Sequence, residues 1–267
     1  MTTGAVIIAI NNEQIDYVSL AAWNSQNIRR HLGIPVAVLT DDVGVHAASF
    51  DRVISVDRPK DAGVRNINLA GRAIWYNTNR VDAYDLSPWT RTIVLDADYV
   101  VASDALNGVI ESDLAFAAHR HAYDVTGRND FRSLNTFGSF AMPMWWATVM
   151  IFNRCAAAEI VFDCMRMIRN NWNHFRNLYG NRQALYRNDH ALSIALAIES
   201  GHTLVTTDIP WSLATVMPDC TVSETEIDHY LIEYTDSEGR PRRVLTANQD
   251  LHVMAKDQLE RIIGHHT

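Results

Sequence analysis

Short apolar segments alternate with helical stretches along the amino-terminal part of the chain. The run AVIIAI at residues 5–10 has no polar interruption, which is typical of a parallel strand covered on both faces. Residues 16–31 space their apolar side chains as a helix does, and the following Gly-Ile-Pro sequence ends it. Residues 36–40 and 52–56 predict two further strands. This β-α-β-β order predicts an α/β fold whose ligands bind beyond the carboxyl ends of parallel strands.

The remaining pattern predicts further elements of the same domain. We expect strands at residues 92–95 and 148–152, helices at 156–170 and 189–201, and a hairpin at 230–245 with its turn at 237–239. Residues 119–140 are polar and aperiodic, and they predict a long functional loop. Because the sequence contains neither a repeat nor a linker, we interpret residues 1–267 as one domain.

Composition narrows the function classes. The three cysteines are too few and too far apart for a disulfide framework or a zinc–thiolate cluster. No apolar run is long enough to span a membrane, and the amino terminus does not resemble a signal peptide, so we expect a soluble cytoplasmic protein without a membrane partner. The net charge of -8 argues against a surface built wholly for nucleic acid, although a local basic site remains compatible with it.

The predicted strand at residues 92–95 leads directly into Asp96-Ala97-Asp98. Two carboxylates separated by one residue at a strand end can both reach one Mg²⁺ or Mn²⁺, which would bridge a substrate diphosphate. The alternative is a turn with two solvated acids, because an Asp-x-Asp triplet often occurs by chance.

The sequence around this triplet resembles the glycosyltransferases of the GT-A fold. LSPWTRTIVLDADYVVASD at residues 86–104 carries the resemblance. The segments at 142–154, 187–198 and 252–256 are similar to later blocks of phage-encoded members, in the same order. The resemblance implies a GT-A type fold, which is a single nucleotide-binding, Rossmann-like domain with a mostly parallel central sheet and a carboxyl-terminal hairpin. It also implies a nucleotide-sugar-dependent hexosyltransferase.

The resemblance implies a metal site formed by Asp96, Asp98 and His252, with Asp96 also near the donor ribose. Mn²⁺ or Mg²⁺ is the implied ion, and a neutral imidazole is a competent ligand for Mn²⁺. Lys256 lies one helical turn after His252 and is expected to meet the diphosphate, as in glycogenin-like enzymes. Taken alone, these two residues would more often be ordinary surface side chains.

The family pattern implies a donor pocket for the base and ribose near the amino terminus. Asn11, Asn12 and Asp41 are expected to read a uracil edge, and Tyr17 to stack on it. These residue types also serve as ordinary loop and helix-capping residues. Arg72 and Arg80 are our candidates for phosphate or sugar contacts. Related sequences often have a lysine near Tyr76 that this chain lacks, so the donor contacts are expected to differ in detail.

Two later segments are expected to face the reacting sugar. Trp145, Trp146 and Thr148 should lie beside the transferred sugar, although both tryptophans are equally compatible with the core, which we favour for at least one of them. Asp189 is our candidate catalytic carboxylate, either deprotonating the acceptor hydroxyl or stabilising the oxocarbenium-like centre. Its alternative role is a plain helix cap.

The donor implied by the family is a UDP-sugar, with UDP-glucose favoured, and the order of motifs favours retention of configuration. The phage resemblance implies 5-hydroxymethylcytosine, or another hydroxymethylpyrimidine, in double-stranded phage DNA within the host cytoplasm as the acceptor. Two Arg-rich aromatic segments favour contacts with a flipped nucleotide. The candidate DNA contacts are Arg120, Arg128, Arg132, Arg176, Arg182 and Arg187.

Other acceptors and another class of protein stay open. A glycan, a lipid-linked sugar or a protein hydroxyl would suit the same transfer chemistry. A non-catalytic module that binds a nucleotide-sugar or a glycan would keep the fold without the activity. The transferred sugar and the oligomeric state are not fixed by the sequence.

Overall fold

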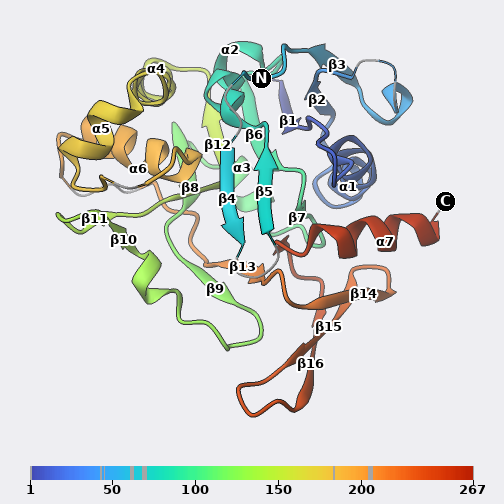
Figure 1. Ribbon diagram of the computed structural model, residues 1–267. Coiled ribbons are helices and arrows are strands. Elements are labelled where there is room, and N and C mark those ends of the chain that lie inside the picture. The colour runs from blue at the N-terminus through green and yellow to red at the C-terminus, as the bar shows by residue number, and fades with distance from the viewer. Residues whose placement is uncertain are drawn as a thin grey trace.

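A computed structural model of the protein describes residues 2–42, 44, 46–60, 63–67, 71–182, 184–203 and 207–266. Within these residues a six-stranded sheet forms the centre of the molecule (Figure 1). Its strands are β1 (Thr3–Ile8), β2 (Val36–Thr40), β3 (Arg52–Ser55), β6 (Arg91–Asp96), β8 (Phe116–His119) and β12 (Trp146–Asn153).

The central sheet has the strand order β3-β2-β1-β6-β12-β8. The first four strands in this order are parallel, whereas β12 runs antiparallel to both β6 and β8. The register pairs Ile8 with Asp96, so β1 and β6 end together at one edge. The predicted fold class, α/β with a mostly parallel central sheet, is confirmed, and the predicted strand-end position of Asp96 is observed.

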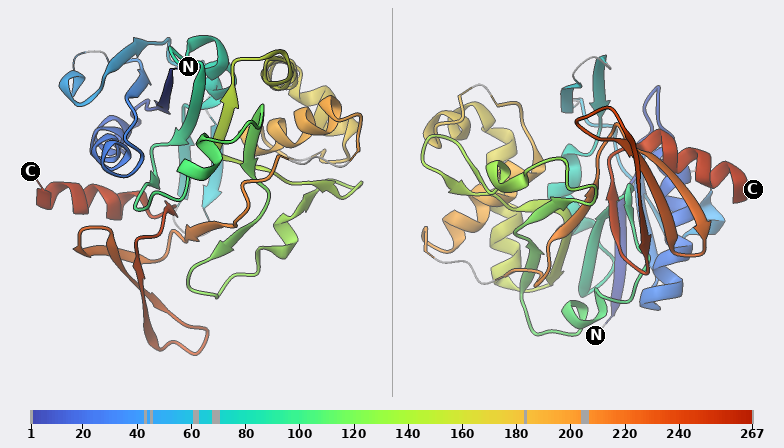
Figure 2. Two further views of the ribbon diagram at one scale, coloured as in Figure 1. Left: turned by 180° about the vertical axis from the view of Figure 1, so that it is seen from behind. Right: turned by 90° about the horizontal axis from the view of Figure 1, so that it is seen from below.

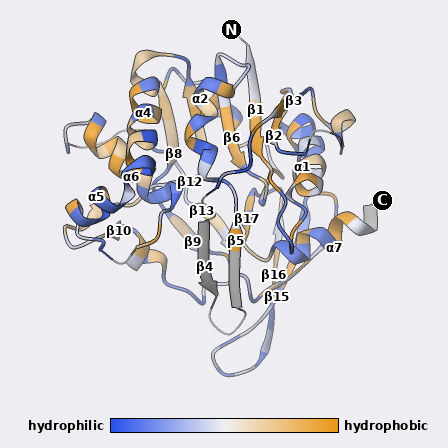
Figure 3. Ribbon diagram, turned by 45° about the horizontal axis from the view of Figure 1, so that its top comes forward, coloured by the Kyte–Doolittle hydropathy of each residue, from blue (hydrophilic) through white to orange (hydrophobic). Residues whose placement is uncertain are grey.

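Helices cover both faces of this sheet. They are α1 (Tyr17–Leu32), α2 (Ala83–Leu86), α3 (Asn107–Ile110), α4 (Ala156–Asn170), α5 (Trp172–Leu178), α6 (Asn188–Glu199) and α7 (Lys256–His266), with the 3₁₀ turns η1 (Ala47–Ser49), η2 (Thr78–Asp82) and η3 (Phe131–Leu134). Ala5 and Ile7 of β1 join the core that contains α1, while Val6 and Ile8 join the core that contains α4 and α6. Two buried faces require an uninterrupted apolar strand, which is why β1 and β6 are hydrophobic in Figure 3.

A second sheet lies beside the carboxyl ends of the central strands. It consists of β7 (Tyr99–Val100), β9 (Ala122–Asp124), β13 (Leu213–Val216) and β17 (Leu251–Val253), in the order β7-β17-β13-β9. Antiparallel pairing of β17 with β7 sets His252 opposite Tyr99, directly after the Asp-x-Asp triplet. Residues 153 positions apart in the chain are thereby brought to one place.

A three-stranded antiparallel sheet projects from this region (Figure 2). Its strands are β14 (Thr221–Glu226), β15 (His229–Thr235) and β16 (Pro241–Ala247). The predicted hairpin is therefore confirmed as β15 and β16, and its turn closes where Asp236 accepts backbone hydrogen bonds from Glu238 and Arg240, both at 2.9 Å.

Short elements occupy two segments for which the sequence predicted none. The predicted loop at 119–140 contains β9, η3 and β10 (Thr136–Phe137), which pairs with β11 (Met142–Pro143). A hairpin of β4 (Gly63–Ile67) and β5 (Gly71–Trp75) precedes η2. Strands of two or three residues are too short to produce a periodic pattern, which explains the first omission. Among the described helices, none combines the length and the hydropathy needed to cross a membrane.

Candidate metal and donor site

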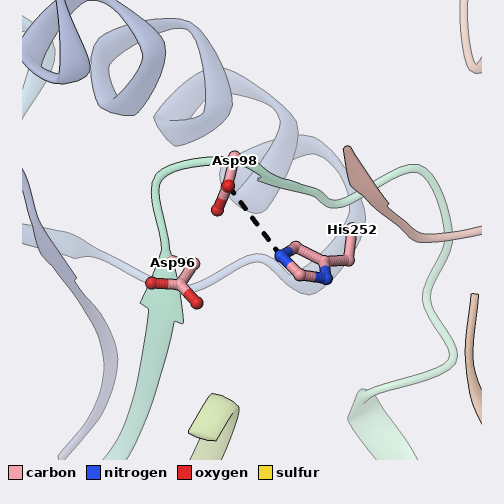
Figure 4. A group of neighbouring side chains, drawn as sticks. All are labelled: Asp96, Asp98 and His252. Atoms are coloured by element: carbon pink, nitrogen blue, oxygen red, sulfur yellow. Dashed lines mark ion pairs between the residues drawn. The ribbon is translucent and has the colours of Figure 1, made fainter. Parts of the chain in front are cut away.

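Three possible metal ligands meet where β6 ends. Asp96 is the last residue of β6, Asp98 directly precedes β7, and His252 arrives on β17. One ligand atom from each side chain lies within 4.8 Å of the others, and Figure 4 shows both carboxylates and the imidazole converging. Asp98 and His252 are buried, with 4% and 9% of their surface exposed. The structure therefore brings together the three residues that the sequence proposed as ligands.

This donor set fits a divalent cation. For a small ion about 2.1 Å from each ligand, opposite ligands lie about 4.2 Å apart, so small side-chain rotations would bring these atoms onto one ion. Two carboxylates and one imidazole suit Mn²⁺ or Mg²⁺ better than a thiolate-binding metal. Burial is the main cause that lowers the pKa of His252, which keeps its ring neutral and able to coordinate near pH 7.

Lys256, the first residue of α7, forms an ion pair with Asp98. Its Nζ lies 3.1 Å from Asp98 Oδ2, and His252 Nε2 lies 3.8 Å from the same oxygen. Burial alone would raise the pKa of Asp98, but the positive charge of Lys256 and its hydrogen bond to Asp98 oppose this effect, and the pKa is lowered. Lys256 also donates to Tyr17 Oη at 3.2 Å, which links α7 to the start of α1. Asp98 is thus ionised, and a cation already faces it.

Arg80 holds Asp96 in the same manner. This arginine lies in η2 and is 1% exposed, and its guanidinium donates to Asp96 Oδ1 and to the Ala147 carbonyl. Burial lowers the pKa of Arg80 to about 10, so it stays charged at neutral pH. We expected Arg80 to contact phosphate or sugar, but its burial and its two partners do not match that role. The guanidinium is hydrogen-bonded to Asp96 and to the main chain, so we interpret Arg80 as the residue that holds the Asp96 carboxylate in place.

Asp189 is joined to the same network through Ala147. The Ala147 amide donates to Asp189 Oδ1 at 2.9 Å, and Arg187 donates to Oδ2 at 2.6 Å. Burial would raise the pKa of Asp189, but the Arg187 charge and the Ala147 amide outweigh it and lower the pKa. Arg187, not Asp189, occupies the cap position of α6. The main chain of Ala147, whose carbonyl accepts from Arg80, therefore links Asp189 to the arginine that holds Asp96, which side-chain patterns do not reveal.

The residues expected beside the transferred sugar are buried. Trp145 and Trp146 are 3% and 6% exposed and belong to different cores, and Thr148 is 3% exposed. Trp146 packs against Phe131 with ring centroids 6.0 Å apart. Both tryptophans are thus core residues, the alternative that was favoured for at least one of them, and they pack on opposite sides of the sheet.

A cleft lies beside the candidate metal ligands, where β1 and β6 end. It is lined by Ile8, Ile10, Tyr17, Trp75, Tyr76, Asn77, Asp96, Ala97, Asp98 and Lys256. The cleft that contains the two carboxylates is therefore also lined by three aromatic side chains and one lysine. Trp75 and Tyr76 had no role assigned from the sequence, and only the fold of η2 and β5 brings them here.

The asparagines of the expected base pocket do not line this cleft but hold the loop that follows β1. Asn11 Oδ1 accepts from the Val18 amide at 3.0 Å, and Asn12 donates to the Ile74 carbonyl at 2.6 Å. Both asparagines therefore hold the loop between β1 and α1. This agrees with the alternative that they are ordinary loop residues. The side chain of Arg72 lies outside the described part of the structure.

Asp41 combines a paired and an unpaired oxygen. Its Oδ2 accepts from Arg58 Nε at 2.6 Å, and Arg58 in turn lies over the Tyr76 ring, 4.9 Å from the centroid. Asp41 Oδ1 is buried and has no hydrogen-bond partner within the described residues. A buried acceptor of this kind favours a ligand that donates a hydrogen bond. Arg58 was not identified from the sequence, because its role depends on Asp41 and Tyr76 together.

The arginines expected to contact DNA are mostly engaged with the protein itself. Arg128 forms two hydrogen bonds with Asp219 at 2.6 and 2.9 Å, and Arg132 pairs with Asp130 at 3.0 Å. Arg120 donates to the carbonyls of Asn135 and Met144. Arg187 pairs with Asp189, whereas Arg176 is half-buried and Arg182 is exposed. On a chain of net charge -8, nearby acids neutralise three of these six cations.

No protein-family model matches the chain, and neither does any curated protein. Among solved structures, it is similar to the glycosyltransferase GlyE of Streptococcus pneumoniae TIGR4 at 16% identity and a TM-score of 0.43, over 73% of this chain and 43% of that chain. This chain therefore spans less than half of the length of GlyE.

Two further similarities cover more of the compared chains. The galactosyltransferase LgtC, in complex with donor and acceptor sugar analogues, matches 71% of this chain with 69% of its own at 16% identity and a TM-score of 0.44. Mouse xyloside xylosyltransferase 1 matches 81% with 88% of its own at 12% identity and a TM-score of 0.47. Because all three scores are below 0.5, the function proposed for this chain rests on its own residues.

We predict that Asp98→Ala weakens Mn²⁺ binding by at least about tenfold, since even residues behind metal ligands contribute about 10- to 100-fold. Titration of the protein with Mn²⁺, followed by the electron paramagnetic resonance of the free ion, measures this directly. Asp104→Ala, at an exposed acid of the next loop, is the matched control and should bind as the wild type does. Equal affinity of both variants would remove Asp98 from the metal site.

We predict that His190 makes the protein less stable in mild acid. Its ring stacks on Trp172 with centroids 5.8 Å apart, and burial lowers its pKa from 6.5 to about 4. The unfolded chain therefore binds a proton that the folded chain refuses, and stability falls as the pH drops from about 6.5 toward 4.

Urea unfolding at pH 7 and at pH 5 tests this effect. His190→Phe keeps an aromatic ring and should reduce the loss of unfolding free energy between these pH values by about 2 kcal/mol. His174→Phe, at an exposed histidine of α5, should leave the loss unchanged. The same pH dependence in wild type and His190→Phe would contradict the prediction.

Proposed function

We propose that the protein is a metal-dependent glycosyltransferase of the GT-A type, which transfers a sugar from a nucleotide-sugar to a hydroxyl acceptor. The observation that carries this proposal is the cluster of Asp96, Asp98 and His252 beside an aromatic cleft that also contains Lys256. Aromatic walls suit a nucleoside base, and cations suit the diphosphate. A divalent ion held by the three ligands would stabilise the negative charge of the departing nucleoside diphosphate.

The charges of the site favour joint binding of the metal and the diphosphate. Asp96 and Asp98 are already compensated by Arg80 and Lys256. A dication added to this balanced set creates an excess of positive charge in a partly buried place, and a diphosphate provides the matching negative charge. This arrangement explains why a donor with two phosphates suits the site better than a neutral sugar does.

The surroundings of Tyr76, which Arg58 connects to Asp41, favour a uracil base. Its N3–H is a donor, and the buried, unpartnered Oδ1 of Asp41 is an acceptor. Tyr17 and Tyr76 offer flat rings nearby, and Arg58 holds Tyr76 in place. We therefore propose a UDP-sugar as the donor and UDP-glucose as the first one to test, with Mn²⁺ or Mg²⁺ as the ion.

Asp189 is our candidate for the carboxylate that faces the reacting carbon. Of its two expected roles, charge stabilisation of an oxocarbenium-like centre fits better than removal of the acceptor proton. Arg187 and the Ala147 amide lower the pKa of Asp189, which makes it a weak base. A carboxylate that stabilises the reacting face is compatible with retention of configuration, which we propose for this enzyme.

For the acceptor we propose a hydroxyl group, and hydroxymethylated DNA is one candidate among several. Arg128, Arg132 and Arg187 are paired with acids of the same chain, so they offer little free charge to a phosphate backbone. Arg182 is exposed and Arg176 half-buried, and these two would have to supply the DNA contacts. A glycan, a lipid-linked sugar or a protein hydroxyl requires no such charge.

We predict Mn²⁺-dependent release of UDP from UDP-glucose, abolished by a chelator and by Asp98→Asn, because this variant removes one charge from the metal site. The assay compares plain DNA, DNA containing 5-hydroxymethylcytosine, and mixed oligosaccharides as acceptors. Release stimulated only by the modified DNA, and weakened steeply by salt, would establish the DNA acceptor. Lack of release with every donor and acceptor tried would favour a non-catalytic binding module.

We predict that Asp189→Asn retains donor binding and loses at least about 100-fold in kcat, since it acts on the transition state and not on affinity. Calorimetry with UDP and Mn²⁺ measures binding, and product formation measures turnover. Asp163→Asn, at an exposed acid of α4, is the control for loss of a surface charge. If Asp189→Asn weakened UDP binding as much as turnover, the residue would be structural.

A further inference from the structure

A second cavity lies beside the four-stranded sheet. Its volume is about 150 Å³, and it shares no lining residue with the donor cleft. An apolar cavity of about 150 Å³ holds one benzene ring, so this space matches a single six-membered ring. The cavity borders the metal shell through the main chain, because Tyr99 follows Asp98 and Asp250 lies two residues before His252.

Asp250 gives this cavity a polar wall. Its Oδ1 accepts from the Ala102 amide at 2.8 Å and from Ser103 Oγ at 2.9 Å, and its Oδ2 accepts from Tyr99 Oη at 3.0 Å. A carboxylate can accept about four hydrogen bonds, so Oδ2 has capacity for one more donor. These neighbours fix the carboxylate in place, and a ligand would meet a preorganised acceptor.

His119 supplies a second acceptor at the inner end. It is 0% exposed, and its Nδ1 lies 3.0 Å from the Trp211 carbonyl, which can only accept, so Nδ1 carries the hydrogen. Burial lowers the pKa of His119 to about 4, so the ring is neutral and Nε2 is an acceptor. No hydrogen-bond partner for Nε2 exists in the described part of the chain. Such a buried, unused acceptor favours a ligand with hydroxyl donors.

Trp211 adds a flat apolar surface. Its half-buried ring is held edge-on by His119, with centroids 6.3 Å apart and planes at 69°. A pyranose ring has hydroxyl groups at its rim and an apolar face of C–H groups, and the apolar face packs on an indole as any hydrocarbon surface does. A benzene-like ligand would use Trp211 and leave both acceptors unsatisfied.

We propose that this cavity is a saccharide subsite that binds one pyranose ring, separate from the donor cleft. The apolar face of the ring packs on Trp211, and its hydroxyl groups donate to Asp250 Oδ2 and His119 Nε2. The choice of a sugar over another polyol of this size rests on the proposed function, because a glycosyltransferase meets sugars in its acceptor and its product. The subsite would hold a sugar unit beside the strands that position Asp98 and His252.

Binding of methyl glucoside and methyl galactoside to the full chain tests the proposal. Saturation-transfer NMR without Mn²⁺ or nucleotide keeps the donor cleft out of the measurement, and cyclohexanol serves as a ring of similar size with one hydroxyl. We expect a glycoside to bind and cyclohexanol to bind at least about tenfold more weakly, because its single hydroxyl can donate to only one of the two acceptors. Absence of glycoside binding, or equal binding of cyclohexanol, would overturn the proposal.

A blocking variant locates the binding. Ala105 is an exposed residue of the cavity lining, so Ala105→Phe fills the space without removing a polar contact. It should abolish glycoside binding, whereas Ala48→Phe, at an exposed position of η1 outside this lining, should bind as the wild type does. Binding that survives Ala105→Phe would place the sugar elsewhere and refute the subsite.

The donor assay separates this proposal from the proposed function. Ala105 does not line the donor cleft, so Ala105→Phe should keep Mn²⁺-dependent release of UDP. Failure of the transferase proposal would appear as absent UDP release in the wild type, and it would leave glycoside binding at the cavity intact. Failure of the subsite would appear as lost or misplaced glycoside binding while UDP release persists.

Discussion

Two carboxylates lie in a partly buried place at the end of β6, and the charges that compensate them organise the site. An ion removed from water without a partner costs several kcal/mol, so Asp96 and Asp98 each require a cation. Arg80 supplies one from η2 and Lys256 supplies the other from α7. Both cations come from segments outside β6, and the packing of these segments is therefore tied to the geometry of the metal ligands.

A single residue, Ala147, is hydrogen-bonded through its main chain to both sides of the site. Its carbonyl accepts from Arg80 and its amide donates to Asp189. Displacement of β12 would therefore disturb Asp96 and Asp189 together. Because β12 is covered by apolar residues on both faces, the main chain at this point is rigid, and rigidity is what preorganised electrostatic stabilisation requires.

The sequence predicts those parts of the fold and of the site that depend on patterns among neighbouring residues. An uninterrupted apolar run is a property of neighbouring residues, so β1, β2 and β6 could be placed, together with the acids that follow β6. His252 and Lys256 could be proposed only through resemblance, because their ligand role depends on β17 pairing with β7.

The sequence could not show which polar groups form hydrogen bonds or ion pairs with one another inside the molecule. The basic loops predicted free arginines, yet Arg128 pairs with Asp219, which lies 91 residues away. Such a partner is invisible to any local pattern. Main-chain groups such as those of Ala147 leave no trace in residue types, and the role of Arg80 follows from its burial, which only the packed structure defines.

The distance in the chain between Asp98 and His252 has a consequence for synthesis. A growing chain can complete β6 and its two carboxylates early, but the imidazole and the lysine that face Asp98 are made more than 150 residues later. Until then the carboxylates lack the imidazole and the lysine that face Asp98. Strand pairing between such distant segments also forms slowly. The candidate metal shell is thus completed only after β17 has been made and has paired with β7.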